Sequence, residues 1–159
     1  MTTPERPTRA SIVSGYFNPL HPGHLDLFEA ARARTGYLVV IVNNDLQQML
    51  KKGKVIQDEG DRLRIVRGLR VVDAAYVAVE DGPGMDASLD LVRADYPDTA
   101  LEFCNGGDRQ DPADLPPEEV AAAARNAITL VYGVGGFDKV DSSTRINAEL
   151  GVDAPSGDA

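Results

Sequence analysis

Two histidines, His21 and His24, are the residues of this sequence whose type and spacing point most directly to chemistry. They are the only histidines in the chain, and both fall in the segment GYFNPLHPGH over residues 15–24. Pro22 suits the first turn of a helix, so both imidazoles are expected beside a helix start, where backbone N–H groups favour an anion. The pair could donate hydrogen bonds to the oxygens of a polyphosphate. The alternative is that both are capping or surface residues.

Two segments further along the chain also carry side chains suited to an anion. Lys51 belongs to the basic segment 51–54, which could equally be a solvated loop, and Arg70 ends a predicted helix, where a cation complements the helix dipole. Ser142, Ser143 and Thr144 open the last predicted helix. They could hold phosphate oxygens there, or serve as an ordinary helix start.

The elements that must position these residues follow from the hydrophobic pattern. Apolar runs predict strands over 10–15, 37–42, 74–79, 101–104 and 127–132, and helical spacing predicts helices over 22–34, 61–70, 85–96, 117–126 and 142–150. This alternation predicts an α/β fold, a Rossmann-like doubly wound five-stranded parallel sheet. Ligands of such sheets bind beyond the carboxyl ends of the strands, where the strand order reverses. The histidine segment follows the first predicted strand and is therefore expected at that edge.

Length, charge and composition restrict the class of protein. The 159 residues suit one domain, divided here into a tail over 1–9, a domain over 10–150 and a linker-like tail over 151–159. That last segment either leads to a fused second domain or is a disordered terminus. The net charge of −9 argues against nucleic-acid binding and against docking on anionic membranes, and no apolar run is long enough to cross a bilayer. Cys104, the single cysteine, is expected to be a buried residue in a cytoplasmic protein rather than a nucleophile.

The segment 15–24 resembles the HxGH signature of the cytidylyltransferase-like nucleotidyltransferases, and residues 140–146 resemble the motif that opens the last helix in that family. The resemblance runs from Ala10 to about Leu150, and over residues 15–73 it is strongest to the glycerol-3-phosphate cytidylyltransferases. It implies the HUP-type nucleotidyltransferase version of the predicted fold. One departure is Asn18, which stands where many relatives have an aspartate.

The resemblance also implies roles for particular residues. His21 and His24 would be catalytic, stabilising charge on the transferred phosphate. The residues expected to bind the nucleotide are these two histidines with Tyr16, Phe17, Gly106, Asp108, Ser142, Ser143 and Thr144. The residues expected to bind the acceptor are Asn18, Lys51, Arg70 and Arg109. No metal site made by the protein is expected, because Mg²⁺ would be carried on the triphosphate.

The implied reaction is attack of an anionic acceptor oxygen on the α-phosphorus of a nucleoside triphosphate, with release of pyrophosphate. We expect CTP as the donor and a small hydroxyalkyl phosphate or phosphonate, such as 2-hydroxyethylphosphonate, as the acceptor. The chain has no tryptophan and 6% aromatic residues, which leaves little material for a cage around a quaternary amine. Two alternatives stay open: an adenylyltransferase that uses ATP on a sugar phosphate, and a nucleotide-binding sensor without turnover. The oligomeric state is also open, a homodimer included.

Overall fold

The computed structural model of the chain describes residues 5–107, 109–135 and 143–151, with the backbone alone for residues 143 and 144. Five strands in this part of the chain form one parallel sheet in the order β3-β2-β1-β4-β5. Their bounds are Arg9–Gly15 for β1, Leu38–Val42 for β2, Ala74–Val77 for β3, Ala100–Cys104 for β4 and Thr129–Val131 for β5. The chain moves outward from β1 in one direction and then returns to pair β4 with β1 on the other side. The predicted doubly wound α/β fold is therefore confirmed.

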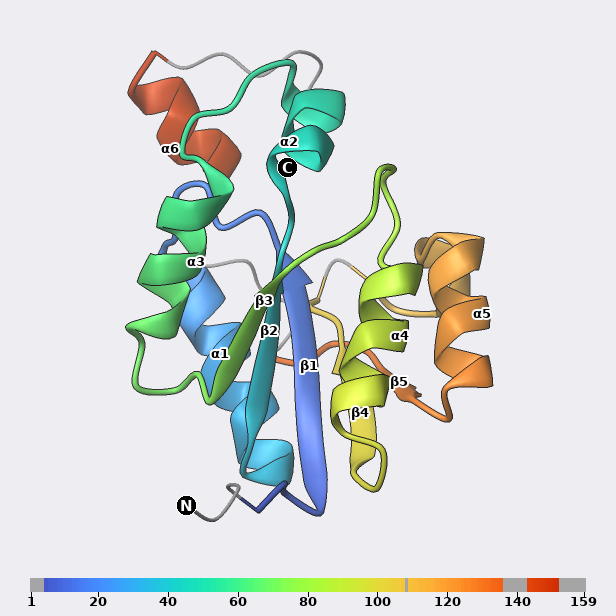
Figure 1. Cartoon of the computed structure of the whole chain (residues 1–159). Helices are drawn as coiled ribbons and strands as arrows, with labels where there is room; N and C mark the ends of the chain where they lie inside the picture. The colour runs from blue at the N-terminus through green and yellow to red at the C-terminus, as the bar shows by residue number, and fades with distance from the viewer. Residues whose placement is uncertain (1–4, 108, 136–142, 152–159) are drawn as a thin grey trace.

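Two pairs of helices cover the two faces of the sheet (Figure 1). On one face lie α1 (Pro22–Thr35) and α3 (Glu59–Arg67); on the other lie α4 (Asp86–Asp95) and α5 (Pro117–Arg125). Alternate residues of β2 belong to two separate buried clusters, with Val39 and Ile41 in one and Val40 and Val42 in the other. A continuous apolar run is the pattern expected for a parallel strand that is covered on both faces.

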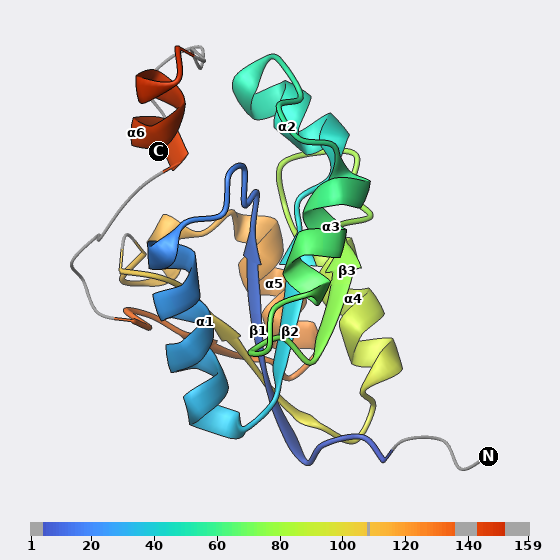
Figure 2. The same cartoon turned by 90° about the vertical axis from the view of Figure 1, so that its left-hand side faces the viewer.

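Two short helices, α2 (Asp45–Lys52) and α6 (Ser143–Glu149), lie beyond the carboxyl ends of the strands (Figure 1, Figure 2). A one-turn 3₁₀ helix, η1 (Pro112–Asp114), lies between β4 and α5. The position of α6 agrees with the helix predicted over 142–150, except that its first residue is Ser143. In the described ranges, no helix is both long enough and apolar enough to cross a membrane.

Helix α2 was not predicted, because the hydrophobic pattern there is inverted. Its buried side chains are polar, namely Gln47, Gln48 and Lys52, whereas its large apolar side chains, Leu46, Met49 and Leu50, are exposed. The signals that mark the helix lie at its ends. Asn44 and Gln47 form a capping box, and Gly53, at a φ of 74°, ends the helix in the left-handed conformation. The alternative that residues 51–54 form a solvated loop does not hold for Lys51 and Lys52, which lie in α2.

Candidate functional site

The connection from β1 to α1 carries the histidine segment and has a strained backbone. Phe17 has a φ of 52°, in the left-handed region that a residue with a side chain rarely adopts. Its ring is buried and packs edge-on against the rings of His24 and Phe28, with centroids 5.0 and 5.2 Å away. A Cβ on Gly15 would lie 2.7 Å from the Phe17 ring, so glycine is needed there. The ring of Phe17 therefore anchors this connection and holds His24 beside it, and the predicted contact of Phe17 with the nucleotide stays a prediction.

The two histidines lie together at the start of α1, and the backbone fixes their orientation. His21 is the N-cap, and its Nδ1 accepts a hydrogen bond from the Gly23 backbone N–H at 3.1 Å. The Nδ1 of His24 accepts one from the His21 backbone N–H at 3.2 Å. The two rings stack with their centroids 3.8 Å apart. Because Nδ1 is an acceptor in both, the neutral imidazoles carry their proton on Nε2, which makes Nε2–H a donor at the helix start.

Asn18 is fully buried, and the protein uses both ends of its amide. The Nδ2 group donates to Oε1 of Gln48 on α2, and Oδ1 accepts from the Gln57 backbone N–H at 3.1 Å. Its backbone carbonyl also accepts from Nδ2 of Asn147 on α6, at 3.2 Å. In the structure this residue therefore joins the β1–α1 connection to α2 and α6. The predicted contact of Asn18 with the acceptor stays a prediction.

Arg62 on α3 is a buried residue of this region that the sequence analysis missed. Its guanidinium donates to the backbone carbonyls of Tyr16 at 2.9 Å, Asn43 at 2.6 Å and Gln57 at 2.8 Å. It also pairs with Asp45, with Nη2 2.9 Å from Oδ1. The side chain therefore fastens the connection after β1 to the one after β2. No local motif marks such a role, because its partners come from distant parts of the chain.

Cationic side chains of α2 approach the same region. The Nζ of Lys51 lies 4.8 Å from the centroid of the Tyr16 ring, which brings two of the predicted site residues together. Lys52 is buried on the face of α2 that also carries Gln48. Burial lowers its pKa, and the charges of Lys51 and Arg62 lower it further. Among the described residues, the Lys52 ammonium has no hydrogen bond or ion pair with a carboxylate. A buried cation in cationic surroundings is suited to an anionic ligand.

The segment after β4 lies beside the one after β1, because the two strands pair in parallel with Ile12 opposite Phe103. Gly106 begins a turn in which its carbonyl accepts from the Arg109 backbone N–H at 3.1 Å. Burial raises the pKa of the Tyr16 phenol, while the positive charges of Arg62 and, to a smaller extent, Arg109 lower it. Gly106, Arg109 and Tyr16 were all predicted site residues, and the structure brings them to one edge of the sheet.

The remaining predicted residues divide into one that is remote and several that the structure does not describe. Arg70 is exposed in the turn between α3 and β3, at the opposite edge of the sheet from the histidines. The structure therefore does not bring it to the site, and it lies beyond the end of α3 rather than within it. Asp108 and Ser142 lie outside the described residues. Ser143 and Thr144 begin α6, but their side chains also lie outside the described part.

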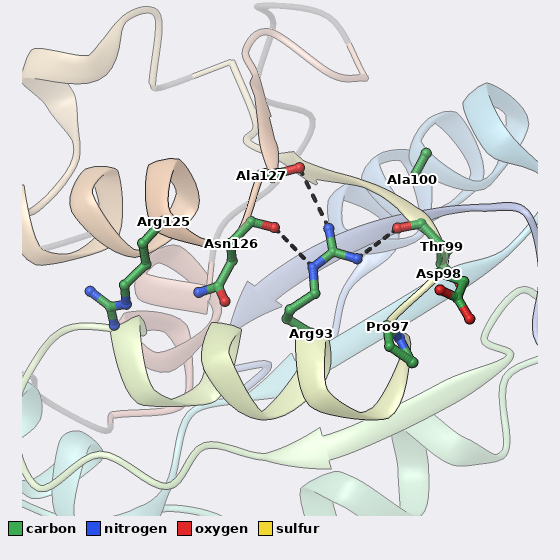
Figure 3. A pocket seen from close by; sticks show the side chains of 8 residues that line it. All are labelled: Arg93, Pro97, Asp98, Thr99, Ala100, Arg125, Asn126 and Ala127. Carbon is green, nitrogen blue, oxygen red and sulfur yellow. Dashed lines mark hydrogen bonds between the residues drawn. The ribbon is translucent and has the colours of Figure 1, made fainter.

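A shallow pocket lies at the amino ends of β4 and β5, away from the histidines, and has no role in the candidate site (Figure 3). Arg93 is the cation at its centre, and the carbonyls of Asn126, Thr99 and Ala127 accept hydrogen bonds from its guanidinium at 2.9, 2.8 and 3.5 Å. These carbonyls belong to the two loops that connect α4 to β4 and α5 to β5. The guanidinium is therefore committed to the backbone and not to a ligand.

Cys104, at the end of β4, is buried as predicted. Burial raises the pKa of its thiol to about 11, so it is not a thiolate at neutral pH. Within the described ranges, no three or more side chains of His, Cys, Asp or Glu gather as a metal-binding group would.

Comparison with known proteins places this geometry in a wider context. The model of a family described as cytidylyltransferase-like matches residues 12–113. The chain is 32% identical over 131 residues to "Bifunctional protein HldE" of Bradyrhizobium diazoefficiens, covering 81% of this chain and 25% of that protein. It is 30% identical over 142 residues to the protein of that name from Halorhodospira halophila, covering 88% and 28%. The chain thus spans about a quarter of the length of these curated relatives.

A solved structure supports the fold alone. The lipopolysaccharide core biosynthesis protein from Thermoplasma volcanium GSS1 superposes with a TM-score of 0.58 at 24% sequence identity. The match covers 84% of this chain and 98% of that one. The likeness therefore extends over nearly all of the neighbouring structure.

Proposed function

Because the chain belongs to the cytidylyltransferase-like family and is a nucleotidyltransferase, we propose that it transfers CMP from CTP to a small hydroxyalkyl phosphate or phosphonate and releases pyrophosphate. The observation that carries this proposal is the stacked pair His21 and His24. Backbone N–H groups donate to both Nδ1 atoms, so in the neutral rings the imidazole N–H of each is on Nε2, at a helix start. Such donors suit the nonbridging oxygens of a phosphate under attack.

The proposed reaction needs no general base, because the acceptor oxygen is already ionised. That oxygen attacks the α-phosphorus of CTP, a new P–O bond forms, and the bond to the leaving pyrophosphate breaks. The two imidazoles donate to the oxygens on which charge grows, while Lys51 and Lys52 hold the anions near one another. Catalysis then consists of positioning and electrostatic stabilisation, with no covalent enzyme intermediate.

We propose that Mg²⁺ enters with the triphosphate. Among the described residues, no three or more side chains of His, Cys, Asp or Glu gather as a protein-held ion would need. On the triphosphate, the ion would neutralise charge on the leaving pyrophosphate. The part left to this chain is to bind the acceptor and to stabilise the α-phosphate.

The choice of CTP is supported by the resemblance of residues 15–73 to the glycerol-3-phosphate cytidylyltransferases. The arginine-rich composition is compatible with the cytidylyltransferase domain of the bifunctional enzyme of fosfomycin biosynthesis, whose acceptor is 2-hydroxyethylphosphonate. We therefore name that phosphonate as a candidate acceptor. The relatives carry the name "bifunctional protein", and the chain matches about a quarter of each. A second domain fused to this one, and action in the cytoplasm, belong to the same proposal.

The proposal is tested by measuring pyrophosphate release with CTP, ATP, GTP and UTP against a panel of acceptors. The panel consists of 2-hydroxyethylphosphonate, glycerol-3-phosphate, phosphoethanolamine, phosphocholine and heptose-1-phosphate. We expect CTP to be preferred, with one of the first two acceptors. Preferred use of ATP with the sugar phosphate would contradict both parts of the proposal, and CTP with phosphocholine would contradict the choice of acceptor alone.

A further inference from the structure

Glu119, in the first turn of α5, is a buried acid that no part of the proposed reaction uses. Its side chain is 4% exposed, and its Oε2 has no hydrogen-bond partner in the described part of the chain. The nearest cationic group is Nη1 of Arg109, 3.7 Å from Oε2, which is too far for a hydrogen bond. A buried polar atom without a partner costs stability, so its presence needs another reason.

The surroundings of Glu119 increase that cost. Burial raises the pKa of the carboxyl to about 7, and Arg109 lowers it by less. The other charged groups that act on it are acids that raise the pKa: Glu80 after β3, Glu118 on the same turn, and Asp86 at the start of α4. Glu80 already accepts hydrogen bonds from Ser88, so it is satisfied within the protein.

Arg109 connects Glu119 to the candidate site. This arginine lies three residues beyond Gly106, in the segment after β4, and its charge acts both on Tyr16 after β1 and on Glu119. Tyr16 in turn carries the Lys51 ammonium over its ring. The same edge of the sheet therefore has cations on the side of α2 and a carboxylate with an unused acceptor on the side of α5.

We propose that Glu119 is a specificity-determining residue of the acceptor site and that its Oε2 accepts a hydrogen bond from a hydroxyl at the end of the acceptor opposite the phosphate or phosphonate. The cations of α2 hold the anionic end of that acceptor. The inference rests on the proposed function, which already gives the acceptor a hydroxyl, and adds to it the residue that recognises this hydroxyl.

A hydroxyl suits this position, because it is the donor that the proposed acceptor carries at the end opposite its phosphate or phosphonate. As a neutral group it can approach Oε2 without repulsion from Arg109. An acceptor that lacks any donor would leave the buried oxygen unpaired, and sites of this kind discriminate strongly against such analogues.

The test compares 2-hydroxyethylphosphonate with ethylphosphonate, which differs only by the hydroxyl, in pyrophosphate release with CTP. For the unchanged protein we expect kcat/KM to be higher for the hydroxyl compound by about 10- to 100-fold. Glu119→Leu should remove this preference, and Glu119→Gln should retain part of it, because the amide oxygen still accepts. The KM for CTP should be unchanged in both variants. Glu118→Gln, an exposed acid one residue earlier, is the matched control and should behave like the unchanged protein.

A preference that persists in Glu119→Leu would overturn the inference while leaving the proposed function intact. No pyrophosphate release with either phosphonate or with glycerol-3-phosphate, for any of the four nucleotides, would contradict the proposed function, and the inference with it. A second readout is thermal unfolding. An acid with a raised pKa destabilises the folded state as the pH rises from its ordinary 4.5 through about 7. Glu119→Gln should therefore raise the Tm at pH 8; a lower Tm there would make the carboxylate a structural partner and overturn the inference.

Discussion

At the scale of single residues, the proposed chemistry depends on which nitrogen of each neutral histidine ring carries the proton. The Nδ1 atoms of His21 and His24 are engaged by backbone N–H groups, so the donors offered to a ligand are the Nε2–H groups. The sequence alone could identify the two residues, because a single ten-residue segment contains both. It could not determine their tautomers, because these depend on the backbone of the folded helix start.

This arrangement predicts a ranking of substitutions at either histidine. Glutamine can place an amide N–H near the position of Nε2, whereas asparagine is too short and alanine has no donor. We expect alanine and asparagine to lower kcat by about 10²- to 10³-fold, as the loss of a donor to a developing charge does elsewhere. Glutamine should lower it less. Steady-state kinetics at saturating CTP provides the measurement, and equal kcat values for all three variants would refute the assigned donor.

Lys52 supplies a second prediction at this scale, concerning pH. Its lowered pKa means that the ammonium loses its proton at a lower pH than the ordinary 10.5 of lysine. Binding of the acceptor should therefore weaken as the pH rises, before an exposed lysine would titrate. Lys52→Met should raise the KM for the acceptor more than the KM for CTP and remove this pH dependence. Lys54→Met, just beyond α2, is the control; if it has the same effect, Lys52 has no particular role.

At the scale of elements, the strands were predictable and the connections were not. Continuous apolar runs such as residues 38–42 leave few alternatives to a buried parallel strand. Helix α2 was missed because Gln47 and Gln48 point inward to bind other connections and Leu50 points outward. Hydrophobic periodicity cannot identify a helix whose buried face is polar, although the capping box at Asn44 could have done so.

Arg62 is the residue on which the relative position of these connections depends most. Replacing it with methionine would remove donors from the carbonyls of Tyr16, Asn43 and Gln57 and leave them buried without partners. We expect Arg62→Met to destabilise the fold by about 3–5 kcal/mol, as the loss of one partner of a buried ion pair does. Urea unfolding measures this change. Arg64→Met, on the exposed side of α3, should change the stability by less than about 0.5 kcal/mol.

Arg62→Lys separates positioning from stability. Lysine keeps the positive charge but cannot reach several carbonyls at once. We expect the variant to fold and to bind CTP with a nearly unchanged KM, but with a lower kcat, because the histidine segment is held less firmly. An unchanged kcat in a folded Arg62→Lys protein would show that the arginine serves stability alone.

At the scale of the whole molecule, the sheet topology decides which predicted residues can act together. Residues that follow the carboxyl ends of β1, β2 and β4 meet at one edge, and this explains why Tyr16, Lys51 and Arg109 are brought near one another. Arg70 precedes β3 and is therefore at the other edge. The hydrophobic pattern of the sequence predicted the sheet. It did not show whether a cation such as Arg70 would lie at the amino ends or at the carboxyl ends of the strands.

Cys104 reports on the stability of the whole domain. Its thiol is buried and is the only one in the chain, and its pKa of about 11 keeps it protonated at neutral pH. We expect a thiol reagent to modify the native protein only through unfolding, and the labelling rate to rise with urea as the folded fraction falls. Saturating CTP with Mg²⁺ should slow the labelling by stabilising the folded state. Rapid labelling of the native protein at pH 7 would show that the thiol is exposed or ionised.

The central claim is that this chain joins a nucleoside monophosphate to an anionic acceptor, and phosphorus NMR of the reaction tests it most directly. The sample contains the protein, CTP, Mg²⁺ and 2-hydroxyethylphosphonate. The account predicts that inorganic pyrophosphate and a pair of coupled resonances from a new phosphonate–phosphate anhydride appear together in equal amounts. The appearance of CDP, or of CMP with the phosphonate unchanged, would mean transfer of a terminal phosphate or hydrolysis, and either result would contradict the account.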